Sequence, residues 1–303
     1  MYQNTNHRWI ILIIWETANS NQVKRYVVCA GRLGNQLFHY AFAHFLLEQD
    51  KNPQKLRVQL LWSQSGTKSL EFLKSSCSHV NLTKSGVLDL MKFKVVASII
   101  KVLKKFGIYG GILNHFIIQE EQALNYHQGM FLLGYFQKYE YVDKVSGTIL
   151  PEIFQALDII QTPSQMLEIE KEKYQVAHIR RGDFLLIENS GFGLLTCDWY
   201  LANLKKDLPI VILTDDLKGA ASVIECLGSN FVFGPEKVDE LQALKIMSSA
   251  THLVAANSTL SWWGGRLARS KGGSVVYPIS ATENHRDINF PGFNLQEGIY
   301  VKI

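Results

Sequence analysis

The sequence predicts an α/β fold with two domains, each built around a parallel sheet. The chain has 303 residues, which corresponds to about two domains at roughly 150 residues each. β-Branched runs alternate with helical patterns in two regions, which begin near Arg25 and near Gln175. Strands separated by helices pair in parallel. A composition of 47% hydrophobic and 19% charged residues excludes disorder, collagen and coiled coil.

Residues 1–24 are expected to form an N-terminal extension. Their apolar run, Trp9–Trp15, has seven residues, whereas a spanning helix needs about 20. One arginine precedes the run and no small-residue cleavage site follows it, so a signal peptide is not indicated. The run is interpreted either as a short apolar patch or as an interfacial anchor.

The first domain is expected over residues 25–165. RYVVCA predicts a strand that stops at GRLGNQ (31–36), and apolar residues at helical spacing predict a helix from Gln36 to Gln49. Asn52–Pro53 ends the helix, and KLRVQLLW predicts the next strand. This order is a βαβ unit. FLLGYFQ (131–137) predicts a further strand.

A helical pattern over residues 87–108 carries lysines beside an apolar stripe. It predicts either a solvated basic face or a surface that contacts anionic lipid. The net charge of +4 is too small to indicate nucleic-acid binding, and it suits an anionic small molecule or an acidic membrane surface. The lysines are Lys92, Lys94, Lys101, Lys104 and Lys105.

The second domain is expected over residues 166–303, after a linker or interdomain helix at 151–173. Strands are expected at VAHI, VIL, FVF, HLVAA and SVVYP. Helical patterns lie between most of them, at CDWYLANLKK, LKGAASVIECL, VDELQALKIMSSA and TLSWWGGRLARS. The alternation predicts a second βα-repeating domain.

The cysteines predict reduced thiols, as in a cytosolic protein. None forms a CxxC pair, which makes both a zinc site and a disulfide framework unexpected. The chain also has no Asp-x-Asp pair, so a metal-bound diphosphate is not indicated. The four cysteines are Cys29, Cys77, Cys197 and Cys226.

Polar residues follow three predicted strands of the second domain directly. Ligands of open parallel sheets bind beyond the carboxyl ends of the strands, so these residues are expected on one rim. Arg180 and Arg181 suit phosphate oxygens, because a guanidinium presents a planar fork of donors. Gly182 lets the backbone approach a bulky anion. Asp183 is expected to hold a guanidinium or bind a ligand hydroxyl; the alternative is a surface ion pair worth little.

The other two groups on this rim each have a functional and a structural interpretation. Asp215 and Asp216 suit ribose or a base, or else cap a helix. The third group opens a helix, whose N–H groups favour phosphate, or else caps it. Trp262–Trp263 is expected in the core. The third group comprises Asn257, Ser258, Thr259 and Ser261.

The first-domain turn GRLGNQ is not a GxGxxG motif. Taken alone it is weak evidence for dinucleotide binding. Its alternative interpretation is a tight strand-to-helix turn with Asn35 as the N-cap.

Five sequence blocks, together with the polar rim, resemble the galactoside α-1,2-fucosyltransferases, inverting enzymes that use GDP-fucose. HIRRGDF resembles the donor-binding signature and is the most specific. The segment GFGLLTCDWY departs from the family, which often has a His-Gly pair there, and the residues before Arg25 have no counterpart. The blocks are GRLGNQLFHYA (31–41), GYFQKYEY (134–141), HIRRGDF (178–184), ILTDD (212–216) and MSSATHLVAANSTLSWWGGRLA (247–268).

The resemblance implies a GT-B architecture, in which two Rossmann-like domains with parallel sheets face across a cleft. L-Fucose would pass from GDP-fucose to the 2-hydroxyl of a terminal galactose in an oligosaccharide or lipid-linked glycan, with inversion and without a metal or another cofactor. The donor would lie on the carboxyl-terminal domain and the acceptor mostly on the amino-terminal one. The acceptor-side residues would be Gly31, Gly34, Asn35 and Gln36.

Three residues are expected to act in the transfer. Arg180 would bond the β-phosphate of GDP with local support from Arg181, and Asn35 would reach fucose or the incoming hydroxyl. Asp183 would orient groups or accept a proton; Glu188 is the other carboxylate nearby. The expected donor-binding residues are His178, Arg180, Arg181, Asp215, Asp216, Asn257, Ser258, Thr259 and Ser261.

Two rival functions stay open: a fucosyltransferase of related fold with another acceptor, and a non-catalytic sugar-nucleotide-binding protein. The expected partners are GDP-fucose and a galactose-terminated glycan, with no nucleic acid. A cytoplasmic location is expected, either unattached or peripheral at the inner face of an anionic membrane.

Overall fold

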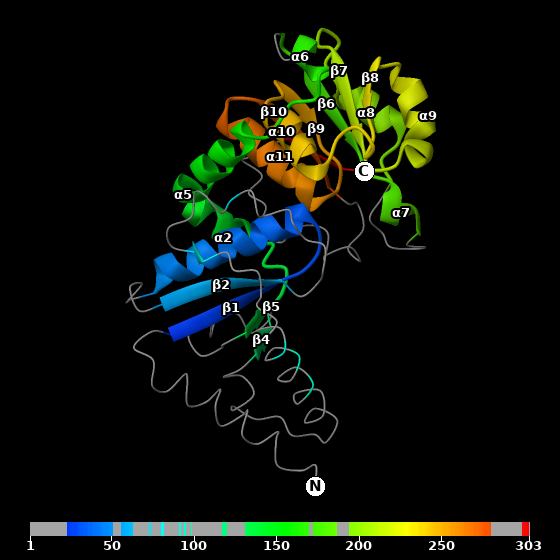
Figure 1. The fold of residues 1–303 in the computed structure, drawn as a ribbon. Helices are drawn as coiled ribbons and strands as arrows, with labels where there is room; N and C mark the ends of the chain where they lie inside the picture. Colours follow the sequence, from blue (N-terminus) through cyan, green and yellow to red (C-terminus); the bar gives the residue numbers. More distant parts are fainter. Residues whose placement is uncertain are drawn as a thin grey trace. The chain divides into compact units, whose positions relative to one another are not determined.

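The computed structural model divides into two compact units, each with its own parallel sheet (Figure 1). The first unit comprises Met1–Ala30, His39–Thr67 and Cys77–Phe136, and the second comprises Gly31–Phe38, Lys68–Ser76 and Gln137–Ile303. The structure describes residues 23–50, 56–62, 80–81, 117–119, 131–169, 172–186, 194–279 and 299–302, and the single positions 73, 91, 94 and 98.

The first unit contains a five-stranded sheet in the order β3-β2-β1-β5-β4, with every pairing parallel. Helix α2 (Leu33–Gln49) follows β1, and residues 36–47 are buried without interruption. A helix that is apolar all round is buried on all sides. The strands are β1 (Val23–Cys29), β2 (Leu56–Trp62), β3 (Val80–Asn81), β4 (Ile117–Gln119) and β5 (Phe131–Leu133).

The second unit contains a six-stranded parallel sheet in the order β11-β10-β9-β6-β7-β8. Counted along the chain, this is the Rossmann order 3-2-1-4-5-6, which reverses direction between its first and fourth strands. Here those strands are β6 and β9. The bounds are β6 (Gln175–Ile179), β7 (Ile210–Thr214), β8 (Phe231–Phe233), β9 (His252–Val254), β10 (Ser274–Ile279) and β11 (Ile299–Lys302).

Seven described helices accompany this sheet, and local caps fix several of their ends. Asp216 caps α9 by accepting from Gly219 N, and Asp239 forms a capping box with Gln242 on α10. Helix α10 packs against α11 and α8 against α9 (Figure 1). The helices are α5 (Tyr139–Asp158), α6 (Met166–Ile169), α7 (Gly182–Leu186), α8 (Cys197–Asn203), α9 (Leu217–Leu227), α10 (Glu240–Ser248) and α11 (Thr259–Ser270).

The predicted α/β class with two parallel sheets is confirmed, and the elements that differ lie around residues 131–173. The strand FLLGYFQ stops at Leu133, and GYFQKYEY runs through a loop into α5. The stretch 151–173, expected as a linker or interdomain helix, holds the last two turns of α5, with Pro151 inside the helix, and the short helix α6. Because α5 belongs to the second unit, the division between units falls before Gln137, whereas the sequence suggested residue 165.

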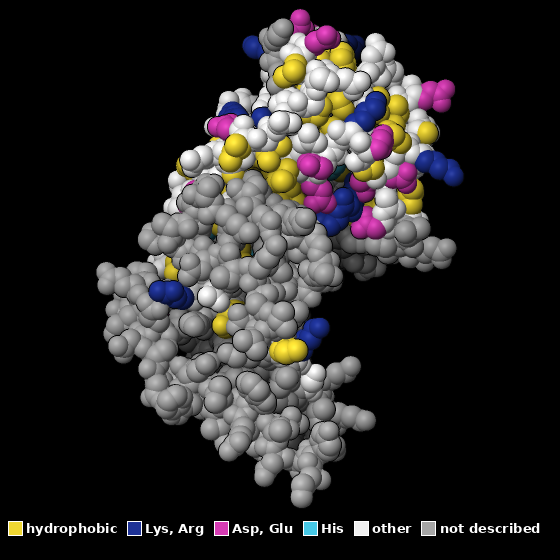
Figure 2. Space-filling model, viewed as in Figure 1, with side chains coloured by type: hydrophobic (Ala, Val, Ile, Leu, Met, Phe, Trp, Pro, Cys, Tyr) yellow, Lys and Arg dark blue, Asp and Glu magenta, His cyan; other side chains and the backbone are white. Residues whose placement is uncertain are grey.

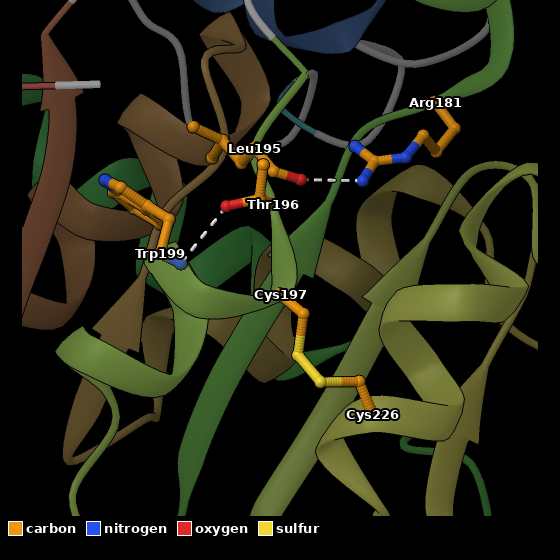
Figure 3. The surroundings of a disulfide bond; sticks show 6 residues. All are labelled: Arg181, Leu195, Thr196, Cys197, Trp199 and Cys226. Atoms are coloured by element: carbon orange, nitrogen blue, oxygen red, sulfur yellow. Dashed lines mark hydrogen bonds between the residues drawn. A yellow bond between two sulfur atoms is a disulfide. The ribbon is translucent and has the colours of Figure 1, made fainter.

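The expectation of reduced thiols is wrong for one pair, because Cys197 and Cys226 form a disulfide (Figure 3). Cys197 begins α8 and Cys226 lies in the last turn of α9; their Cα atoms are 6.4 Å apart, within the range that a disulfide requires. No local spacing signals this pair, because it is created by the packing of the two helices. Cys29 is buried, and burial raises the pKa of its thiol.

Several predictions fall outside the described residues. They are the apolar run Trp9–Trp15, Cys77, Glu188 and most of the lysine-bearing pattern at 87–108, of which only positions 91, 94 and 98 are described, all as helix. In the part of the chain that the structure describes, no helix is both long enough and apolar enough to cross a bilayer.

Candidate functional site

The polar residues singled out in the sequence gather at the carboxyl edge of the six-stranded sheet, where the strand order reverses. Arg180 and Arg181 follow β6, and the loop that begins α11 follows β9, its neighbour. Asp215 follows β7 on the other side of β6. In sheets of this order, ligands bind in the crevice at the reversal point.

Arg180 is held by two carboxylates of very different exposure. Its NH1 lies 2.6 Å from Asp215 Oδ2, and its NH2 bonds Asp183 Oδ1. The Asp215 side chain is 10% exposed, whereas that of Asp183 is 56% exposed. The centroid of the Phe184 ring lies 5.2 Å from the guanidinium carbon of Arg180. Asp215 therefore holds Arg180 from a largely buried position, whereas Asp183 contacts it from an exposed one.

Arg181 has a different role from Arg180, because its side chain donates hydrogen bonds to backbone carbonyl groups. It is 6% exposed. Its NH2 donates to Leu195 O at 2.7 Å (Figure 3). Its NH1 donates to Arg180 O at 3.0 Å. Its backbone N–H donates to Asp215 Oδ1 at 2.8 Å. Arg181 thus ties the site to the segment that begins α8, whose Thr196 side chain caps the helix at Trp199 N.

The two adjacent aspartates, Asp215 and Asp216, also have different roles. Asp215 contacts both arginines and lies at the position that a Cβ on Gly182 would occupy. Asp216 caps α9 through Gly219 N at 3.0 Å. The Asp216 carboxylate is therefore a helix cap, which was one of the two interpretations of its sequence. Asp215 is not used in this way, and its carboxylate positions Arg180.

The turn GRLGNQ belongs to the second unit and approaches the start of α11 closely. Gly31 has a φ of +77°, a conformation that favours glycine. A Cβ on Gly34 would overlap Leu260 N and come within 2.6 Å of the Thr259 carbonyl carbon. Only glycine permits this approach. It brings the first turns of α2 and α11 together, and both helix ends present N–H groups that favour an anion.

Two residues of this site were not predicted from the sequence: Arg32 and Glu240. Glu240 Oε1 accepts from Arg32 Nε, and its Oε2 accepts from Leu33 N at 3.1 Å. Arg32 NH1 also lies 3.9 Å from Asp215 Oδ2. The basic residue within GRLGNQ was a signal that the sequence offered. Glu240 gave none, because it lies more than 200 residues away.

Asn35 and Gln36 have contacts of different kinds. Gln137 Nε2 donates to Asn35 Oδ1 at 2.9 Å, which links two of the sequence blocks. Gln36 is fully buried and donates to Gly31 O at 2.9 Å. Gln36 therefore stabilises the turn, and Asn35 is the half-buried polar side chain of the pair. Asn35 is not the N-cap of α2, which begins at Leu33.

The segment after β9 supplies a cap, a buried hydroxyl and two core side chains. Ser258 caps α11 by accepting from Ser261 N at 3.1 Å. Ser261 Oγ lies 2.7 Å from His178 Nδ1 and accepts from Ala256 N at 2.8 Å. Asn257 and Thr259 are half-buried at the rim. The expectation for Trp262 and Trp263 is confirmed, since both are buried against Phe38.

His178 is buried beside Arg180 and Arg32, and its charge state follows from that position. Burial, followed by the charges of Arg180 and Arg32, lowers the pKa of His178 to about 3. The imidazole is therefore neutral at physiological pH. Tyr200 OH donates to His178 O at 2.8 Å, and burial raises the pKa of Tyr200, so the phenol stays protonated.

The surface of the second unit carries both signs of charge. Figure 2 shows basic and acidic side chains side by side on one face, with hydrophobic side chains around them. Among the residues that the structure describes, no three His, Cys, Asp or Glu side chains are grouped to hold a metal ion.

Comparison with known proteins gives one informative sequence relative. No family model matches the chain. The chain is 25% identical over 289 residues to the O-antigen biosynthesis glycosyltransferase WbnK of Escherichia coli. This alignment covers 84% of this chain and 93% of WbnK. The similarity supports a glycosyltransferase.

Solved structures resemble the chain distantly. E. coli heptosyltransferase WaaC with ADP matches with a TM-score of 0.47 and 10% identity, over 92% of this chain and 93% of that one. Fucosyltransferase NodZ from Bradyrhizobium matches with a TM-score of 0.39 and 11% identity, over 80% of this chain and 92% of that one.

Proposed function

We propose that the chain transfers L-fucose from GDP-fucose to the 2-hydroxyl of a terminal galactose, with inversion and without a metal ion. One observation carries the proposal: Arg180 stands at the reversal point of the six-stranded sheet, anchored by buried Asp215 and bonded to exposed Asp183. Fucose as the transferred sugar and galactose as the acceptor are proposed from the resemblance of the five sequence blocks to galactoside α-1,2-fucosyltransferases. The similarity to an O-antigen biosynthesis glycosyltransferase suits an oligosaccharide or lipid-linked acceptor.

Arg180 is the group proposed to stabilise the leaving diphosphate. A β-phosphate oxygen replaces the Asp183 carboxylate on NH2, while Asp215 keeps the guanidinium in place. Arg32 and the first turns of α2 and α11 add positive potential at the same rim. Charge on the diphosphate grows as the bond to fucose breaks, so these donors bind the transition state more strongly than the ground state.

The transfer is a single displacement at the anomeric carbon of fucose. The bond from this carbon to the β-phosphate oxygen breaks, and its electron pair leaves with GDP. The galactose 2-hydroxyl oxygen forms the new bond from the opposite face. The hydroxyl proton passes to a base, for which Asp183 is the proposed group once the diphosphate has displaced it from Arg180. The transition state is oxocarbenium-like, so a weak base suffices.

The test is incubation of the full chain with GDP-fucose and a panel of galactosides, with and without EDTA, followed by linkage analysis. The proposal predicts an α-1,2-linked fucose that forms equally well with the chelator present. Loss of turnover with EDTA that added metal restores contradicts metal independence. Fucose on another hydroxyl contradicts the acceptor assignment, and binding of GDP without any glycoside product favours a non-catalytic binding protein.

A further inference from the structure

A buried pair of side chains, His178 and Ser261, joins β6 to α11 beside Arg180. His178 is 4% exposed and Ser261 is fully buried. The Ser261 hydroxyl lies 2.7 Å from His178 Nδ1 and accepts a hydrogen bond from Ala256 N at 2.8 Å. Ser258 Oγ accepts from Ser261 N, so the first turn of α11 holds the hydroxyl in this position.

The protons of this pair have one arrangement that satisfies both the Ser261 hydroxyl and His178 Nδ1. The Ser261 hydroxyl has a single proton, and the Ala256 N–H already occupies one of its lone pairs. Within the described residues, His178 Nδ1 is the remaining partner of this hydroxyl. A fully buried hydroxyl without an acceptor is unfavourable. The hydroxyl therefore donates to Nδ1, which carries a lone pair.

The charges around His178 exclude the imidazolium form. Arg180 lies two residues after it, just beyond the end of β6, and Arg32 lies in the turn before α2; both charges disfavour a third cation. The Asp215 carboxylate forms ion pairs with both arginines, through Arg180 NH1 at 2.6 Å and Arg32 NH1 at 3.9 Å. From α8, Tyr200 contacts only the backbone carbonyl of His178. A neutral imidazole with a lone pair on Nδ1 carries its proton on Nε2.

We propose that Ser261 is a positioning residue that locks His178 in the Nε2–H tautomer, which makes the imidazole a permanent uncharged hydrogen-bond donor to an oxygen of the bound nucleotide. No residue that the structure describes accepts from Nε2. The donor stands at the carboxyl edge of β6, next to Arg180. Only the identity of the ligand rests on the proposed function; the tautomer is a property of the protein alone.

The tautomer is measured by two-bond proton–nitrogen NMR on the full chain labelled with 15N-histidine. His178→Gln identifies the signal among the nine histidines. The proposal predicts a protonated-type shift for Nε2 and an unprotonated-type shift for Nδ1 throughout the range from about pH 5 to 8. A mixture of tautomers, an Nδ1–H form or a titration in this range overturns it.

Two serine variants distinguish the effect of the Ser261–His178 hydrogen bond from the effect of removing any buried serine hydroxyl. Ser261→Ala removes the hydroxyl, and the His178 signal is expected to shift toward a tautomer mixture. Ser248→Ala is the matched control: Ser248 is also a buried helical serine, but its hydroxyl donates to Lys245 O at 2.8 Å, on α10. The control is expected to leave the signal unchanged. An unchanged Nε2–H form in folded Ser261→Ala overturns the role of Ser261.

Ligand binding tests the donor role with GDP as the probe. The amide nitrogen of Gln reaches about as far as Nε2, whereas that of Asn reaches only as far as Nδ1. His178→Gln is therefore expected to bind GDP close to wild type, and His178→Asn about tenfold to a hundredfold more weakly. Equal affinities of the two variants, each shown to be folded by thermal unfolding, overturn the donor role. Failure of the wild type to bind GDP overturns the proposed ligand, while the NMR result still decides the tautomer.

Discussion

Arg180 and Arg181 are consecutive residues of the same type, yet their surroundings give them opposite roles. Arg180 pairs with two carboxylates, one of them exposed. Arg181 donates to two backbone carbonyls in the protein interior. Consecutive side chains beyond a strand point to opposite sides, so one guanidinium reaches the rim and the other reaches the segment before α8. The pair of adjacent arginines is thus one group at the rim of the sheet and one structural group in the interior.

This difference also explains how the site stays in place without a ligand. Arg181 and Asp215 form a frame, since Asp215 accepts from the Arg181 backbone and holds the Arg180 side chain. The disulfide adds a second connection between the helices that leave this frame, α8 and α9. The frame is buried, and the exchangeable contact, Asp183, is exposed.

The largest expected effect is that of Arg180→Ala on transfer. Removal of one stabiliser of developing charge typically costs about 10²–10³ in turnover, and we expect a loss of that size in variant protein that thermal unfolding shows to be folded. Initial rates with GDP-fucose measure it. Lys218→Ala, which removes an exposed cation from α9, is the control and should keep wild-type rates. Near-normal transfer by folded Arg180→Ala would remove this residue from the mechanism.

Arg181→Ala should act on stability first. It leaves the carbonyls of Leu195 and Arg180 without their donors in the interior, and hydrogen bonds to a charged group contribute about 1.5–3 kcal/mol each. We expect the free energy of unfolding to fall by about 3 kcal/mol, measured by urea denaturation. If Arg181→Ala is as stable as wild type and loses activity as Arg180→Ala does, the two arginines share one role and the comparison fails.

Loss of the disulfide should also destabilise the second unit. Cys197 and Cys226 are 29 residues apart, and closure of a loop of this length is worth roughly 3–4 kcal/mol in the chain-entropy treatment. The paired variant Cys197→Ser with Cys226→Ser should unfold at lower urea concentration than the oxidised wild type. Addition of a dithiol reductant is expected to lower the stability of wild type and leave the paired variant unchanged. Equal sensitivity of both proteins would contradict a disulfide in solution.

The smallest expected effect, for pH values down to about 5, is the pH dependence of stability that comes from His178. Its pKa is about 3 in the folded protein, against an ordinary histidine value of 6.5, so between these values the unfolded chain binds more protons and stability falls as pH falls. The contribution is complete above pH 6.5 and is lost at about 1.4 kcal/mol per pH unit below it. Urea unfolding at several pH values should show a shallower acid slope in His178→Gln. An identical slope in both proteins would contradict a buried neutral His178; His252, whose pKa burial also lowers, contributes equally to both.

Elements with local signals could be predicted from the sequence, and elements created by packing could not. The patterns LKGAASVIECL and TLSWWGGRLARS match α9 and α11 at both ends, because Asp216 and Ser258 cap these helices from adjacent positions. Pro151 was expected to begin a linker or interdomain helix, yet it lies inside α5, whose apolar face is buried. Tertiary burial outweighed the local preference there.

The candidate site divides in the same way. Its place at the carboxyl ends of the strands follows from the βα alternation, and the three polar groups do meet at one edge of the sheet. The division of labour within adjacent pairs, Arg180 with Arg181 and Asp215 with Asp216, depends on which side of the sheet each side chain reaches. The contact of Glu240 with Arg32 depends on the packing of α10, which no local pattern shows.

The most direct test of the central claim is a comparison of GDP and GMP binding by calorimetry in wild type and Arg180→Ala. If Arg180 holds the β-phosphate, wild type binds GDP about tenfold to a hundredfold more tightly than GMP. Arg180→Ala should lose this preference and bind GMP as wild type does. A variant that retains the full preference for GDP would contradict the account.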